Sequence, residues 1–274
     1  MLKVSCNEKE TNYIMYNKNF LTDVFLRYDY SASQPDLQDT INNEFRAVVL
    51  DKFPILDEKE SIEKQVQVSL DQKNSFIVNE KRFKEWFFWD INRKNCVQIN
   101  TNSVVFVIKS YTMFSDLREI YTTILKGAEK YYPSIKFKRI GLRYVDQIEL
   151  DNNKRVNRWY DFWKNYINLK LLKGIDFCEK DLESGLTRQM NLIEANYGNY
   201  SVRFQYGIFN SDYPAINKKK VFVLDTDVYA TGIFEYDECD QYIIEFHQKA
   251  KNYFEKSIRE SLKTIMGSDN GAED

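Results

Sequence analysis

The sequence predicts an α+β fold in which a unit of element order β-α-β-β-β-β-α occurs twice. Segments with the patterns of strands and helices follow that order in each half of the 274 residues. Two tripeptides also recur at one spacing. "LRY" occurs at 26–28 and 142–144, "VFV" occurs at 105–107 and 221–223, and both offsets (142 − 26 and 221 − 105) equal 116. These matches favour an internal duplication.

The first half begins with "LTDVFLRYDY" (21–30), whose alternation predicts a strand. Pro35 stands where the first residue of a helix is favoured. Apolar residues with a period of 3.6 then run over 37–49, so we expect one helix that ends before Pro54.

The rest of the first half predicts more strands and a second helix. The helix is expected from about Ser115, with an apolar stripe, and Pro133 lies beyond its end. Before it come four strand-like runs, at 64–70, 83–91, 96–100 and 104–111.

The second half repeats this order. A strand at 137–148 precedes an aromatic amphipathic helix that is expected over 156–167 and fades before Gly174. A long helix, at about 238–266, closes the half, and Gly267 supplies its stop signal. Between the two helices the expected strands are a weak one at 171–178 and three stronger ones at 186–197, 200–209 and 220–230.

These elements divide the chain into an N-terminal extension (1–20), a first repeat (21–135), a second repeat (136–266) and a disordered acidic tail (267–274). A β-α-β-β-β-β-α unit with a curved antiparallel sheet and its helices on one face is the arrangement of helix-grip and TATA-binding-protein-like folds. We therefore expect two units of this kind.

The segment "FKEWFFWDI" (83–91) is apolar on both of its faces. A strand that is buried on both sides explains the pattern most simply. An aromatic groove for a peptide or for nucleic-acid bases is the alternative.

Composition and charge set limits on function. Hydrophobic residues make up 43% of the chain and aromatic residues 15%, which is enough for a substantial core. Lys and Arg total 39 against 41 Asp and Glu, a net charge of −2. A dedicated nucleic-acid-binding protein usually has a basic excess, so this balance argues against one, although a local basic groove stays open.

The four cysteines, at positions 6, 96, 178 and 239, are far apart, which argues against a zinc site and against a disulfide framework. The first 20 residues contain no apolar leader core, and no window resembles a membrane-spanning helix. We expect a cytoplasmic protein with reduced thiols and no membrane partner. Because no glycine-rich phosphate loop and no GxSxG motif occurs, we expect no cofactor and no hydrolase elbow.

The most informative polar residues lie on the predicted strands of the second half. Arg139, Gly141 and Arg143 share one strand face, opposite an apolar face. The last strand likewise places three polar residues on one face. With two arginines from the intervening strands, the candidate ligand-binding residues are Arg139, Arg143, Arg188, Arg203, Asp225, Asp227 and Tyr229.

Two interpretations of this charged face stay open, with a third behind them. The first is a structural ion-pair network across a half-exposed sheet. The second is a groove whose arginines bind a phosphate or carboxylate while the aspartates bind a metal or a partner's cation. The third is Mg²⁺-dependent catalysis at Asp225 and Asp227, which normally requires further carboxylates.

His247 is the only histidine, so any catalytic His would have to be this residue. It falls on the apolar stripe of the last predicted helix, between Ile243 and Ala250. This position predicts a histidine that is packed beneath the sheet and hydrogen-bonded to a neighbour.

The stretch "KRIGLRYVDQIEL", the later "VLDTDVY" and the helix with "EFHQKAKNYFEKSI" resemble a sporadically distributed bacterial protein family. Its hallmarks are an R-x-G-L-R-Y strand, a D-x-D-x-Y strand and a His-bearing C-terminal helix. The resemblance is specific over 137–266 and general over 20–131, and it departs at Asp146, where the family pattern has Asn. It implies no activity, but its patchy distribution is typical of mobile or anti-phage defence genes.

We therefore predict a non-enzymatic binding protein that recognises a protein partner or a small ligand, through a groove or at the junction of its halves. An accessory role in an antiviral defence or mobile-element system, with a partner from the same operon, is part of this prediction. The alternative is a nucleic-acid-binding protein or a metal-dependent nuclease that uses the charged face of the second repeat.

Overall fold

The computed structural model describes residues 16–68, 76–150, 158–179, 186–211, 213–215 and 221–267. Within them, nine strands form a single antiparallel sheet of order β2-β3-β4-β5-β1-β6-β9-β8-β7. The class is therefore mixed α and β, with the antiparallel sheet that the strand patterns predict. Most of the expected N-terminal extension and acidic tail lies outside the described residues.

The first half follows the predicted order. Its elements are β1 (Leu21–Tyr30), a 3-10 helix η1 (Pro35–Leu37), α1 (Asn43–Lys52), β2 (Ile55–Val68), β3 (Phe76–Trp89), β4 (Cys96–Ile99), β5 (Ser103–Ile108) and α2 (Phe114–Tyr131). The single helix expected from Pro35 to Pro54 is wrong. Its apolar stripe is divided between η1 and α1, because the Asn42 side chain accepts a hydrogen bond from the backbone N–H of Phe45, 2.9 Å away, and so begins a new helix.

The second half differs from the prediction in one strand and in its last helix. Its elements are β6 (Phe137–Glu149), α3 (Trp159–Trp163), α4 (Lys173–Glu179), β7 (Gln189–Asn196), β8 (Ser201–Ile208), β9 (Val221–Phe234), α5 (Tyr236–Ser257) and α6 (Glu260–Met266). The strand expected at 171–178 is wrong, because α4 occupies that segment. A strand would bury residues two apart, whereas Leu172 and Ile175, three apart, are buried and Phe177 is exposed.

The long helix expected over 238–266 is two helices, α5 and α6. The chain is extended at Ile258, which forms an isolated antiparallel bridge with Ile167. The backbone N–H of Arg259 donates to the carbonyl of Tyr166, 2.8 Å away, so the chain after α3 takes up the donor that would otherwise continue the helix. Gly267, with φ of 69°, ends α6 as predicted.

The two halves of the chain meet at the centre of the sheet. β1 pairs with β6, and from this seam the strand order reads β1-β5-β4-β3-β2 on one side and β6-β9-β8-β7 on the other. Leu26 and Leu142, the leucines of the two "LRY" tripeptides, are directly paired across the seam. The "VFV" tripeptides are not at matching places: Val105 pairs with Arg27, but Val221 pairs with Glu149 rather than with Arg143.

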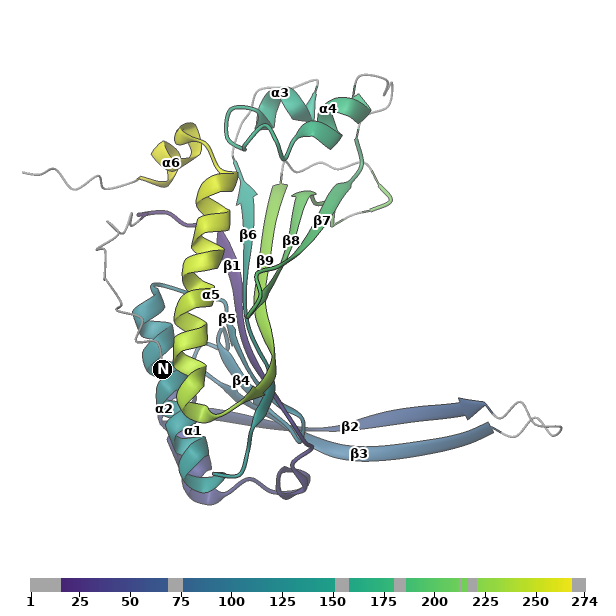
Figure 1. Cartoon of the computed structure of the whole chain (residues 1–274), viewed down its shortest axis with the longest axis vertical. Coiled ribbons are helices and arrows are strands. Elements are labelled where there is room, and N and C mark those ends of the chain that lie inside the picture. The colour runs from purple at the N-terminus through teal and green to yellow at the C-terminus, as the bar shows by residue number, and fades with distance from the viewer. Residues whose placement is uncertain are drawn as a thin grey trace, which may run out of the picture.

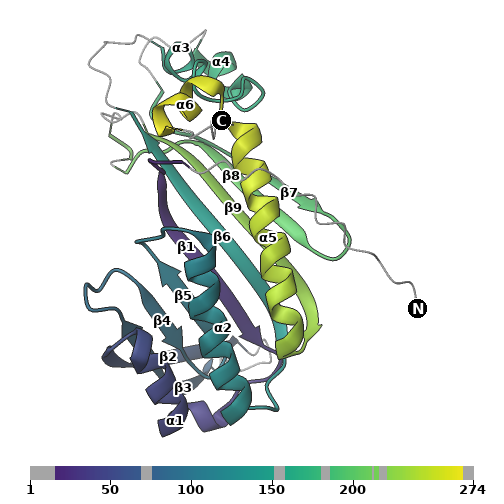
Figure 2. The ribbon, with the colours of Figure 1, turned by 90° about the vertical axis from the view of Figure 1, so that its left-hand side faces the viewer.

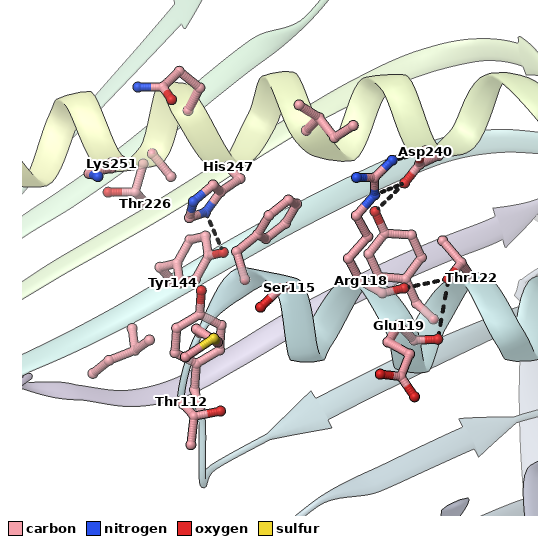
Figure 3. A pocket seen from close by; sticks show the side chains of 18 of the residues that line it. Thr112, Ser115, Arg118, Glu119, Thr122, Tyr144, Thr226, Asp240, His247 and Lys251 are labelled. Atoms are coloured by element: carbon pink, nitrogen blue, oxygen red, sulfur yellow. Dashed lines mark hydrogen bonds and ion pairs between the residues drawn. The ribbon is translucent and has the colours of Figure 1, made fainter. Parts of the chain in front are cut away.

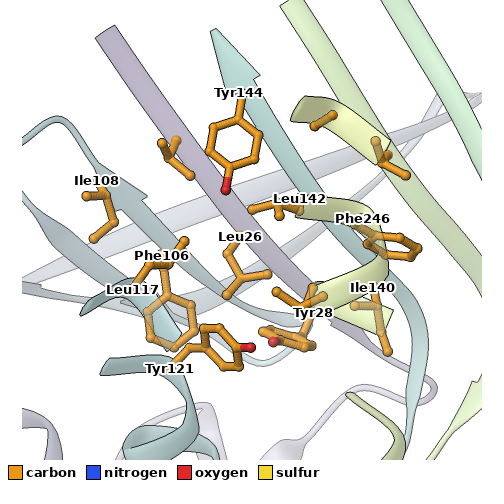
Figure 4. Packing of buried hydrophobic residues seen from close by; sticks show 14 of the residues in the cluster. Leu26, Tyr28, Phe106, Ile108, Leu117, Tyr121, Ile140, Leu142, Tyr144 and Phe246 are labelled. Atoms are coloured by element: carbon orange, nitrogen blue, oxygen red, sulfur yellow. The ribbon is translucent and has the colours of Figure 1, made fainter. Parts of the chain in front are cut away.

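Helices α1, α2 and α5 lie on one side of the sheet, and the β2–β3 hairpin extends away from them (Figure 1). α2 belongs to the first half and α5 to the second, and both run along the same face of the central strands (Figure 2). The core lies between these helices and the sheet (Figure 4). It includes Leu26, Tyr28, Phe106, Ile140, Leu142 and Phe246, which are fully buried.

The aromatic strand β3 is buried on one face only, so the expectation of burial on both faces is wrong. Trp86 and Phe88 are in the core, whereas Phe87 and Trp89 are half-buried and stack on each other with ring centroids 6.4 Å apart. The reason is that α1 and α2 lie on a single face of this part of the sheet (Figure 2). Ile91 lies beyond the strand and is exposed.

The described cysteines, Cys96, Cys178 and Cys239, are free thiols. None of the helices in the described ranges has the length and apolar character needed to cross a membrane.

Candidate functional site

The arginines of β6 lie on the open face of the sheet, by which we mean the face opposite α2 and α5. Ile140, Leu142 and Tyr144 are buried on the helix-covered face, while Arg139 and Arg143 alternate with them. The predicted division of the two faces of this strand is therefore confirmed.

The open-face arginines form ion pairs with the aspartates of β9. The Arg143 guanidinium donates two hydrogen bonds to the Asp225 carboxylate, each 2.7 Å long. Arg139 donates one to Asp227 at 3.1 Å, and its guanidinium lies 4.9 Å from the ring centroid of Tyr229. A Cβ atom at position 141 would lie 2.8 Å from the Arg139 guanidinium, which is too close. The absence of a side chain at Gly141 therefore allows the Arg139 side chain to lie over this position.

Of the remaining two predicted residues, Arg203 lies beside this cluster and Arg188 lies apart from it. Arg203 of β8 is paired in register with Asp227 of β9, and its guanidinium lies 3.7 Å from Glu194. Arg188 precedes β7, which β8 separates from β9, and its guanidinium lies 5.8 Å from the Tyr213 ring centroid. The structure thus brings together six of the seven candidate residues and leaves Arg188 apart.

The ion pairs account for the open face without a ligand. Burial raises the pKa of Asp227, and the positive charges of Arg139 and Arg143 oppose that rise. Each of the two β9 aspartates binds an arginine of β6, so neither the arginines nor the aspartates are left as free charges. The interpretation of this face as an ion-pair network is therefore favoured, and anion or metal binding there stays a prediction.

We expect Arg143→Ala to lower the free energy of unfolding by about 2 kcal/mol, because Asp225 would keep a largely buried charge without its partner. The loss is smaller than for a fully buried pair because the Arg143 side chain is 45% exposed. Arg93→Ala is the matched control. It breaks a two-bond pair with Asp57 whose partners are both exposed, so it should cost less stability than Arg143→Ala in urea unfolding. Equal losses in the two variants would contradict a structural role for Arg143.

A cavity lies on the other face of the sheet, between α2 and α5 (Figure 3). Its volume is about 1160 Å³. Tyr144 and Asp146 of β6 and Thr226 of β9 contribute to its floor, and Phe114 of α2 and Ile244 of α5 line it from the helices. The cavity thus lies at the junction of the two halves of the chain.

A cluster of hydrogen bonds joins α2 to α5 at one part of the cavity wall (Figure 3). Arg118 donates two hydrogen bonds to the Asp240 carboxylate, at 3.0 and 2.6 Å, and the Tyr121 hydroxyl donates a third at 2.6 Å. These donors lower the pKa of Asp240, so its carboxylate stays ionised and holds the two helices together.

His247 of α5 lies between the two helices and the sheet. Its Nδ1 is 2.9 Å from the Tyr144 hydroxyl, and its ring stacks on Phe114 with centroids 4.0 Å apart and planes 4° apart. Burial lowers the pKa of His247 to about 4, so the ring is neutral at pH 7. The prediction of a packed histidine with a hydrogen-bonded neighbour is confirmed.

Asp146 is an acidic residue on the cavity floor. The residue is only 9% exposed and lines the cavity. Across the described ranges, no hydrogen bond or ion pair to its carboxyl group is found. Burial, with a smaller contribution from Asp225, raises the pKa of Asp146 to about 7.

The sequence did contain a signal for this site. Along β6 the residues on the helix-covered face are Ile140, Leu142, Tyr144, Asp146 and Ile148. An acidic residue in an otherwise apolar series is rare unless it is paired or functional. Asp146 is also the position at which the chain departs from the pattern of the resembling family.

Comparison with known proteins assigns no family to the chain. No protein-family model matches the chain, and no curated protein is significantly similar to it. Among the residues that the structure places, no group of three or more His, Cys, Asp or Glu side chains could hold a metal ion.

Proposed function

We propose that the protein is a non-enzymatic binding protein that takes a small, mainly apolar ligand in the cavity between α2 and α5. The observation that supports this most strongly is the cavity itself. Its volume, about 1160 Å³, is slightly above the roughly 300 to 1,000 Å³ of a typical small-molecule site, and its lining combines aromatic and aliphatic side chains with polar groups. The helices that form its walls are already joined by Asp240, so the site is preformed.

We also infer that the two halves arose by duplication, which would explain why the cavity lies at their junction. The mirrored strand order and the pairing of Leu26 with Leu142 support this inference. The unequal places of the two "VFV" tripeptides and the replacement of one strand by α4 argue for divergence since then.

An accessory role in a defence or mobile-element system remains part of the proposal, and it rests on the resemblance alone. We give less weight to a nucleic-acid or nuclease function. Its candidate arginines, Arg139 and Arg143, already bind Asp227 and Asp225, which reduces the positive charge that a phosphate backbone would meet.

Binding of a neutral apolar fluorophore, N-phenyl-1-naphthylamine, tests the cavity directly. We expect it to bind the wild-type protein with enhanced fluorescence and to lose at least about tenfold in affinity in Ile244→Trp, because the indole would fill part of the cavity. Ile265→Trp is the control: Ile265 is as exposed as Ile244 (42% against 41%) but does not line the cavity. Absence of binding, or equal affinity in both variants, would overturn the proposed site.

A further inference from the structure

Asp146, on the cavity floor, is an acid for which the described residues supply no hydrogen-bond or ion-pair partner. Two other acids of the lining are satisfied: Asp240 accepts hydrogen bonds from Arg118 and Tyr121, and Glu255 accepts one from Tyr16. Asp146, by contrast, is 9% exposed, and its carboxyl group contacts no hydrogen-bond donor or cation among the residues described by the structure. A buried carboxyl group without a partner is costly unless something else satisfies it.

The neighbours of Asp146 do not supply a positive charge. Tyr144, two residues before it on the same strand face, shares its hydroxyl with His247 Nδ1. His247 is neutral, because burial lowers the pKa of its ring. The next polar residue of the floor, Thr226, is uncharged.

The charge of the whole lining favours a cation. Among the lining residues that the structure describes, six carboxylates face three cationic side chains, the latter being Arg118, Lys126 and Lys251. Arg118 is already paired with Asp240. Electrostatic complementarity of this kind selects the sign of a ligand's charge.

The aromatic rings of the cavity suit the same kind of ligand. Tyr111 meets Tyr144 edge to face, with ring centroids 5.8 Å apart, and Phe114 stacks on His247. All four rings line the same cavity as Asp146. The faces of such rings attract cations, and their edges and faces pack against apolar groups.

We propose that the ligand is a protonated amine carried on an apolar or aromatic body, with its ammonium group bound to the Asp146 carboxylate. This assignment rests on the proposed binding function, and it adds the chemical class of the ligand. The amine supplies the donors that Asp146 lacks, while the body occupies the apolar part of the cavity.

Three indole compounds of similar shape test the assignment by calorimetric titration at pH 8: tryptamine (a cation), tryptophol (neutral) and indole-3-acetate (an anion). A charge-assisted hydrogen bond in a buried site corresponds to about tenfold to hundredfold in affinity. We therefore expect wild-type protein to bind tryptamine at least tenfold more tightly than tryptophol, and to bind indole-3-acetate most weakly. Asp146→Asn should bring tryptamine and tryptophol to within about threefold of each other.

The outcomes separate the two proposals. Equal binding of the three compounds by wild-type protein, with binding lost in Ile244→Trp, would overturn the amine assignment and leave the binding site standing. Failure of tryptamine to bind while N-phenyl-1-naphthylamine binds would do the same. Binding of tryptamine that neither Asp146→Asn nor Ile244→Trp changes would overturn both proposals.

Discussion

We expect Asp146→Asn to change how the free energy of unfolding depends on pH. The difference between its values at pH 6.5 and at pH 4 should be about 3 kcal/mol more positive in the variant than in the wild-type protein. The folded pKa of Asp146 is about 7, above its ordinary value of 3.8. The folded state therefore holds a proton that the unfolded state has released over this interval, and stability falls as pH rises. Asparagine does not titrate, so the variant lacks this decrease in stability between pH 4 and pH 6.5. Urea unfolding at both pH values measures the difference.

His247→Gln should have the opposite effect of similar size. The folded pKa of His247 is about 4, below its ordinary value of 6.5, so between pH 4 and 6.5 the unfolded state binds the proton that the folded state lacks. Stability from this group is complete above pH 6.5 and is lost as pH falls towards 4. Removing it should lower the stability at pH 6.5 relative to pH 4 by about 3 kcal/mol.

In the wild-type protein these two contributions oppose each other and nearly cancel between pH 4 and 6.5. The charged and titratable groups around Asp146 and His247 come from several elements. They are Tyr144 on β6, Asp225 on β9, Tyr111 before α2, and Lys251 and Glu255 on α5. A pH profile that neither variant changes would show that Asp146 and His247 are solvated rather than buried.

The second large effect is expected at the seam between the halves. Leu26→Ala and Leu142→Ala should each lower the free energy of unfolding by about 3 to 4 kcal/mol, because both side chains are completely buried and directly paired across β1 and β6. The double variant should lose less than the sum of the two, since the second truncation enlarges an existing cavity.

The exposed Leu169 supplies the control, and Leu169→Ala should change stability by less than about 0.5 kcal/mol in the same denaturant titration. Losses that add fully in the double variant would mean that Leu26 and Leu142 do not contact each other. Such a result would contradict a continuous sheet through the centre of the protein.

Alternation and helical period predicted the elements wherever one face of an element is buried. β1, β5, β6 and α2 are of this kind, and their expected positions agree with the structure to within a few residues. β2 begins at Ile55, well before the expected start at residue 64, and its backbone pairs with β3 from that residue on. The prediction missed the first part of the strand because that part is the charged run "LDEKESIE". No apolar period marks such a strand, since the hairpin extends away from the core.

The two candidate sites differ in how far a sequence can predict them. The open-face arginines could be identified, because their face follows from counting along a strand. Their partners could not, because Arg143 meets Asp225 only through the register of β6 against β9. The cavity depends on the spacing of α2 and α5, which Arg118 and Asp240 join across 122 residues of chain, and no local pattern encodes that distance.

A crystal structure of the protein with tryptamine tests the central claim most directly. We predict electron density for the indole between α2 and α5, with the ammonium nitrogen about 3 Å from a carboxylate oxygen of Asp146. Density for tryptamine on the open face beside Asp225 and Asp227, with the cavity between the helices holding solvent alone, would contradict it.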